Sequence, residues 1–304
     1  MSSFQMAELP HQEDIYEVVM IIINLLSILG CCFNLVLTVS LKISENPLGK
    51  MVVALSLMDL IANSISLLMG LNISTELWCH VIGFMQAFGF GGSIFWSCFF
   101  AHAYYVMHKK QDNKIINSYL TMYMIISTCL SIGLGIFSVS ISFISLDLDE
   151  KRCVHDPNLE FFDWKSVIML VVPSVGSVAF CLGCYLVARS KYKNSESASI
   201  KGVLIYPLIL AICYFPLALQ ELYIQITSKS SPFWIDLSVS VLLYSQGFLN
   251  AFAYGLSGAI SGTCRNTKCF KRSQIKETSL EQSVSVNLVS EIDESHQDIY
   301  ESDQ

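Results

Sequence analysis

The chain has 304 residues, of which 53% are hydrophobic and only 14% are charged, whereas about a quarter of the residues of an average soluble domain are charged. A soluble fold of this length could not bury so much apolar surface, and the same composition excludes disorder over most of the chain. The formal net charge is −7, but residues 277–304 contain eight acids and no Lys or Arg, which leaves a net charge of +1 on residues 1–276. A basic surface for nucleic acid is therefore not expected.

Seven segments are long and apolar enough to cross a bilayer, which takes about 20 mostly apolar residues. They are residues 15–41, 50–71, 79–107, 118–145, 165–188, 202–226 and 233–256. Residues 1–14 contain neither an apolar core nor a basic start, so the first segment is expected to serve as its own insertion signal. The sequence thus predicts an all-α membrane protein, a seven-transmembrane helix bundle.

Lys and Arg are distributed unevenly between the two alternate sets of loops. One set, together with the stretch that follows residue 256, holds 14 of them, and the other set holds four. Because cytoplasmic loops are enriched in Lys and Arg, this places the N-terminus outside and the C-terminus in the cytoplasm. The expected organisation is an extracellular N-terminus (1–14), the bundle (15–256), a basic juxtamembrane helix (257–276) and a disordered acidic cytoplasmic tail (277–304), in a multi-pass protein of the plasma membrane.

Five residues are candidates for covalent modification. On this topology Cys79 and Cys153 are the only two of the eleven cysteines that face the oxidising exterior, so we expect a disulfide between them, with two free thiols as the alternative. Asn72 begins the only glycosylation sequon and lies outside, close to the membrane. Cys264 and Cys269 follow the last segment and are palmitoylation candidates, with plain free thiols as the alternative.

Polar residues recur at one depth inside the predicted bundle. With a helix rise of about 1.5 Å per residue, Asn34, Asp59 and Asn250 lie roughly 10–13 Å from the inner edge of their segments, and Ser93 lies slightly farther. Polar side chains at such depth usually have a partner or a task. We expect a shared hydrogen-bond network that could hold a sodium ion or a proton on Asp59, or that could be purely structural.

Two other groups of residues point to motion and to a ligand. Pro207 and Pro216 interrupt the sixth segment, where they form either a hinge or static kinks. Polar and aromatic residues in the outer half are ligand-binding candidates, since ligands of such bundles enter between helices: Gln86, Gln220, Glu221, Tyr223 and Asp236. Glu221 and Asp236 could oppose a cationic ligand, an anionic nucleotide would instead need the bases of the external loop, and no residue supports cyclic AMP.

Two stretches carry a family resemblance that covers about residues 15–256. They are Tyr206-Pro207 followed by Ile212-Cys213-Tyr214-Phe215-Pro216, and Gln246-Gly247-Phe248-Leu249-Asn250. Both resemble the cyclic-AMP-receptor-like G-protein-coupled receptors of slime moulds, plants and other protists. The resemblance implies a receptor that responds to an extracellular ligand of unknown identity, couples to a heterotrimeric G protein and places Pro207, Tyr214 and Pro216 at a hinge in the sixth helix.

The chain is also similar to rhodopsin-like receptors at Asn34, at Leu55-Ser56-Leu57-Met58-Asp59 and at Asn250 with Tyr254. That resemblance implies that an inner switch and sodium site is formed by Asn34, Asp59, Ser93, Asn250 and Tyr254. Three departures stand against it: Ala103-Tyr104-Tyr105 replaces the Asp-Arg-Tyr triplet, Tyr214 replaces a Trp, and Ala251 replaces a Pro. The arginine-based ionic lock of those receptors is therefore absent in its usual form.

Enzymatic functions find little support. The last segment has no Lys for a retinal Schiff base, and among the six His only His102 lies in the interior of a segment, whereas a zinc hydrolase needs several. No glycine-rich phosphate loop occurs, and no cofactor is expected. The alternative to a receptor is a proton- or ion-coupled transporter that uses Asp59, Glu221 and Asp236, with His102, as a relay.

Overall fold

The computed structural model describes residues 10–40, 47–69, 75–110, 115–141, 144–147, 152–155, 167–191, 205–227 and 231–254. The chain divides into two compact units, Met1–Gly255 and Leu256–Gln304, and all of the described residues belong to the first. Asn72, Cys264 and Cys269, the predicted juxtamembrane helix and the predicted acidic tail lie outside the described residues.

Helices make up almost all of the described part of the chain. They are α1 (Pro10–Ser40), α2 (Pro47–Met69), α3 (Glu76–Lys110), α4 (Ile115–Ser140), the π-helical stretch η2 (Val167–Val171), α6 (Val172–Lys191), α8 (Ile205–Thr227) and α9 (Phe233–Tyr244). Residues 246–254 are also helical and follow α9 after a turn. Six helices of the described chain are long and apolar enough to cross a membrane, and α9 is a shorter apolar helix. The chain is therefore a helical, multi-pass membrane protein.

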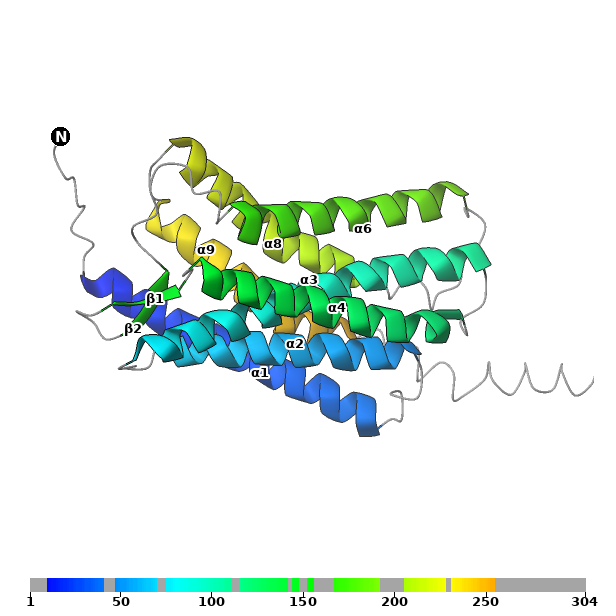
Figure 1. Ribbon diagram of the computed structural model, residues 1–304, viewed down its shortest axis with the longest axis horizontal. Coiled ribbons are helices and arrows are strands. Elements are labelled where there is room, and N and C mark those ends of the chain that lie inside the picture. Colours follow the sequence, from blue (N-terminus) through cyan, green and yellow to red (C-terminus); the bar gives the residue numbers. More distant parts are fainter. Residues whose placement is uncertain are drawn as a thin grey trace, which may run out of the picture. The chain divides into compact units, whose positions relative to one another are not determined.

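The helices run side by side, with a small hairpin at one end (Figure 1). Within this unit α3 packs against α2, α4, α6 and α8, while α1 packs against α2 and α9. The hairpin consists of β1 (Ile144–Asp147) and the antiparallel β2 (Arg152–His155), and a disulfide joins Cys153 of β2 to Cys79 of α3, with a Cα–Cα distance of 5.4 Å. We call this end of the bundle the hairpin end.

The hairpin corrects one predicted segment. Residues 118–145 were expected to form one span, but α4 ends at Ser140 and Ile144 already pairs with His155. Hydropathy cannot separate a short apolar strand from the end of an apolar helix. The pairing with β2 satisfies the backbone groups that a longer helix would have satisfied internally.

The helices carry apolar side chains outside and polar side chains inside. Along α1, one face is buried and consists of small or polar residues spaced three or four apart: Asn24, Ser27, Cys31, Asn34 and Thr38. The opposite face of α1 exposes large apolar residues, among them Ile22, Leu29 and Val36. A helix of a soluble protein has the reverse pattern, whereas small and polar residues at helix contacts are typical of membrane bundles.

The prolines of α6 and α8 lie in different local structures. η2 ends two residues before Pro173, so the wider π-helical turn lies directly before a residue that cannot donate a backbone hydrogen bond. α8 begins at Ile205, which puts Pro207 in its first turn, a position that tolerates proline. Pro216 is the proline inside α8, and it removes a hydrogen bond from the interior of the helix.

The turn after α9 has an identifiable cause in α1. The Ser27 hydroxyl donates to the Tyr244 carbonyl and accepts from the Phe248 N–H at 3.4 Å, which are the two groups that pair with each other in an unbroken α-helix. A hydroxyl inserted into the backbone ladder bends a helix. Gly247 permits this approach, because a Cβ there would lie 2.8 Å from the sulfur of Cys31 and 3.3 Å from the Ser27 carbonyl.

Candidate functional site

Asp59 is the centre of a buried polar cluster that joins three helices. It lies on the inward face of α2, and its carboxylate accepts hydrogen bonds from the Ser93 hydroxyl of α3 and from the Asn250 amide, the latter at 2.8 Å. The Gln246 amide donates to the Ser93 hydroxyl at 2.8 Å. All four side chains are at least 98% buried. We call Asp59, Ser93, Gln246 and Asn250 the Asp59 cluster.

Asn34 and Tyr254 were expected to belong to the Asp59 cluster, but both lie beside it and make other contacts. The Asn34 amide donates to the Ser56 hydroxyl at 3.4 Å, one turn of α2 away from Asp59, and no bond between Asn34 and Asp59 is present. Tyr254 is buried in an aromatic core that also contains Trp96 and Tyr206. The structure therefore brings Asp59, Ser93 and Asn250 together directly and places Asn34 and Tyr254 at the border.

The charge of Asp59 is met only by neutral groups within the described residues. Its side-chain partners are a hydroxyl and an amide, whereas buried charges in proteins are usually paired or bind a metal ion. The amide oxygens of Gln246 and Asn250 are buried without a partner, and each belongs to an amide whose nitrogen already contacts the cluster. A carboxylate with two free amide oxygens is a donor set that suits a hard cation such as sodium.

Transition-metal chemistry has no comparable donor set. The described residues hold no group of three or more His, Cys, Asp or Glu side chains that could bind a metal ion. The oxygen donors of the Asp59 cluster suit a hard cation or a proton on Asp59.

A second polar layer lies nearer the hairpin end. The Gln86 amide of α3 donates to the Tyr244 hydroxyl at 3.2 Å. Ser66 of α2, whose own hydroxyl donates to the Ala62 carbonyl at 2.9 Å, lies beside the Tyr244 hydroxyl. The Tyr244 ring meets Phe90 edge-on, with 5.5 Å between the ring centroids. Asn63, three residues before Ser66 on α2, donates to the Asp59 carbonyl at 2.7 Å. We call Asn63, Ser66, Gln86 and Tyr244 the Gln86 layer.

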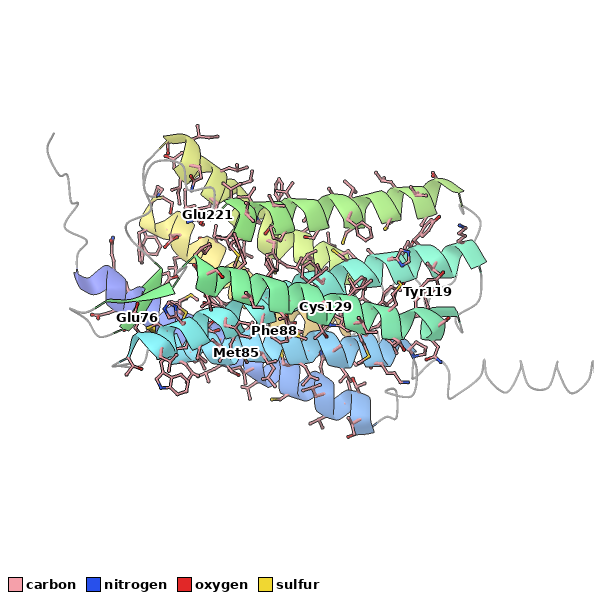
Figure 2. The ribbon with its side chains drawn as sticks, viewed as in Figure 1. Glu76, Met85, Phe88, Tyr119, Cys129 and Glu221 are labelled. Carbon is pink, nitrogen blue, oxygen red and sulfur yellow. A yellow bond between two sulfur atoms is a disulfide. The ribbon has the colours of Figure 1, made fainter. Side chains whose placement is uncertain are left out.

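The remaining ligand-binding candidates do not form one site. The Gln220 amide donates to the Asp236 carboxylate at 2.6 Å and to the Ser231 hydroxyl at 2.8 Å, so the Asp236 side chain already has a partner. Tyr223 is 46% exposed on the apolar outer surface. Figure 2 places Glu221 toward the hairpin end and Tyr119 toward the opposite end. A cation bound between Glu221 and Asp236 would therefore have to compete with Gln220 for the Asp236 carboxylate.

Aromatic contacts occupy the end of α3, where Ala103-Tyr104-Tyr105 replaces the Asp-Arg-Tyr triplet. Tyr104 is buried and its ring lies 6.4 Å from that of Tyr185 on α6. His102 shares a 2.6 Å hydrogen bond with the Tyr123 hydroxyl of α4. These contacts connect α3 to α4 and α6 through tyrosine and histidine side chains, where an arginine would make an ion pair.

Several residues of these clusters were not assigned to a site from the sequence. Gln246 precedes Asn250 by four residues, and Asn63 follows Asp59 by four, so helical spacing puts each on the same face as a predicted residue. Tyr244 and Ser66 carry no such signal, because their meeting depends on how α2 and α9 pack. No known family model matches the sequence, and no curated protein is similar to it.

Proposed function

We propose that this chain is a seven-helix receptor that transmits the binding of an extracellular ligand to a heterotrimeric G protein in the cytoplasm. The observation that carries the proposal is the Asp59 cluster, a buried carboxylate held by neutral groups from α2, α3 and residues 246–254. Binding or release of a cation or proton at such a cluster would couple a local charge to the packing of three helices.

A seventh span is part of the proposal. α9 is short by itself, but Ser245 N–H donates to the Val241 carbonyl at 3.0 Å and Leu249 N–H donates to the Ser245 carbonyl at 2.9 Å, so the helical ladder continues across the turn. At about 1.5 Å per residue, residues 233–254 reach roughly 33 Å, enough for the hydrocarbon core. With seven spans, the Lys and Arg distribution puts the hairpin end outside and the opposite end in the cytoplasm.

The same geometry supplies a route for the signal. A ligand at the hairpin end contacts α3 and α9 through the Gln86 layer, and these are the helices that continue into the Asp59 cluster. Pro216 weakens α8 in its interior, at a helix that packs against both α3 and α9. Rearrangement of these helices at the opposite end then changes the surface offered to the G protein.

A proton- or ion-coupled transporter is the second candidate, and the deep burial of the Asp59 carboxylate favours it. A relay also needs successive titratable groups within reach of one another. Within the described residues Asp59 bonds to a hydroxyl and an amide, and the Asp236 side chain bonds to Gln220. These neutral connections favour a switch over a relay.

The experiment that tests the proposal is a cell-based screen of extracellular solutes that records several second messengers, in cells with the wild-type chain or with Asp59→Asn. We expect at least one solute to change a cytoplasmic messenger, with altered potency or basal level in the variant. Uptake of a solute or a proton current without any messenger response would favour the transporter instead.

A further inference from the structure

The Gln86 layer contains acceptors that no group in the described structure satisfies. The amide oxygens of Gln86 and Asn63 are buried and lack a hydrogen-bond partner, although the nitrogen of each amide is used. Both side chains are more than nine-tenths buried. A buried acceptor without a partner costs free energy. Asn63 and Ser66 are three residues apart on one face of α2, and Gln86 of α3 lies at the level of Ser66. The two acceptors therefore mark a place for a molecule that donates hydrogen bonds.

Distance along the helices separates this layer from the carboxylate below it. Ser66 follows Asp59 by seven residues on α2, and Gln86 precedes Ser93 by seven on α3. At about 1.5 Å per residue, both positions lie roughly 10 Å nearer the hairpin end than the Asp59 cluster. The two helices therefore place Gln86 and Ser66 at the same level, where the Gln86 amide donates to the Tyr244 hydroxyl.

The layer itself is uncharged, which decides the class of ligand. Its side chains are two amides and two hydroxyls, and the Asp236 carboxylate of α9 is bonded to Gln220. A cation or an anion placed in such a layer would lose its hydration without gaining a countercharge. An uncharged molecule with N–H or O–H donors would satisfy both amide oxygens at no such cost.

We propose that the Gln86 layer binds an uncharged small molecule through donors on that molecule, with Gln86 and Asn63 as the accepting residues. The proposal rests on the receptor function proposed above and names the chemistry of its ligand. It differs from a cationic site at Glu221 and Asp236, because the selecting groups are neutral amides on α2 and α3.

The test uses three probes of one size that differ in charge: benzamide, benzylammonium and benzoate. Their binding to the purified full-length protein in lipid nanodiscs is measured by saturation-transfer NMR, without any G protein, so that failure of the ligand site is distinguishable from failure of coupling. Empty nanodiscs correct for partition into lipid. We expect benzamide to bind more tightly than either charged probe.

Variants assign the binding to the layer. Gln86→Met and Asn63→Leu should each weaken benzamide about tenfold, whereas Gln225→Met, a matched change near the end of α8, should leave it unchanged. Gln86→Glu places a carboxylate in the layer and should reverse the order, so that benzylammonium binds at least tenfold more tightly than benzamide. This gain cannot be produced by a variant that fails to fold.

Three outcomes overturn the proposal. Benzylammonium could bind the wild-type protein best and lose its binding in Asp236→Asn, which would put the site at the acids of the hairpin end. Alternatively, none of the probes binds, or benzamide binding survives both Gln86→Met and Asn63→Leu, which would mean that the two amide oxygens are satisfied by water only.

Discussion

At the scale of residues, the depth of each polar side chain in the bundle could be predicted from the sequence, but its contacts could not. Counting residues from the segment edges put Asn34, Asp59, Ser93 and Asn250 in one layer, and three of these four do meet. Helix rise fixes only the position along the bundle axis, whereas the direction of a side chain depends on the rotation of its helix. Asn34 lies at the right depth and yet bonds to Ser56.

Substitutions at Asp59 separate its charge from its hydrogen bonds. Asp59→Asn keeps the volume and can still accept from Ser93, so we expect a thermal stability in detergent within about 1 kcal/mol of the wild type. Asp59→Leu leaves the Ser93 hydroxyl and the Asn250 amide without their acceptor, and each buried unpaired group costs roughly 1–3 kcal/mol. Equal unfolding temperatures for the two variants would show that the cluster does not contribute to stability.

Sodium provides a second test at this scale. If the free amide oxygens of Gln246 and Asn250 complete a cation site with Asp59, sodium chloride should raise the unfolding temperature more than choline chloride at the same ionic strength. Binding to the folded state at a free concentration of 100 times Kd stabilises by about 2.7 kcal/mol. The difference between the salts should vanish in Asp59→Asn, and its persistence there would place the ion elsewhere.

At the scale of elements, apolar runs predicted the helices, while contacts from distant parts of the chain set their ends and breaks. The run of residues 233–256 looks uninterrupted in sequence, yet Ser27 divides it by bonding to Tyr244 and Phe248. The partner lies more than 200 residues away, so the segment itself does not show that a hydroxyl of α1 enters its backbone ladder. The same holds for the strand β1, whose pairing with β2 overrides an apolar run that fits a helix equally well.

Two glycines test how closely the helices approach. A Cβ at Gly89 on α3 would lie 2.8–3.0 Å from backbone and side-chain atoms of Ala62 on α2, whereas a Cβ at Gly183 on α6 would meet nothing within 4 Å. Gly89→Ala should therefore destabilise the protein by about 1–3 kcal/mol through overpacking. Gly183→Ala should stabilise it by roughly 0.5–1 kcal/mol through helix propensity.

Thermal unfolding of the two Ala variants in one detergent checks this contrast. If both variants lose stability, the bundle is generally intolerant of added volume. If both variants gain stability, Gly89 and Ala62 are too far apart for a Cβ at Gly89 to clash.

At the scale of the whole molecule, composition predicted the membrane and the charge distribution predicted its sides. The exposed apolar and buried polar faces of α1 agree with a location in the membrane. The orientation in the membrane remains a prediction, because helices alone do not define which side is outside. The ligand and the coupling partner could not be predicted, since both depend on surfaces formed by several helices together.

Thiol labelling in intact cells tests the orientation. We expect a membrane-impermeant maleimide to label Cys79 and Cys153 only after an impermeant reductant has opened their disulfide. Cys264 and Cys269 should react only after the membrane has been permeabilised. A variant that lacks the four cysteines serves as the control for the remaining thiols, and labelling of Cys264 in sealed cells would reverse the proposed topology.

Nucleotide exchange measures the central claim most directly. The purified chain in nanodiscs is mixed with purified heterotrimeric G proteins of each major class, and GTP analogue binding is followed for the wild type and for Asp59→Asn. Our account predicts accelerated exchange on at least one class, with a rate that differs several-fold between the two forms. No acceleration on any class, combined with proton flux in proteoliposomes that is lost in Asp59→Asn, would contradict it.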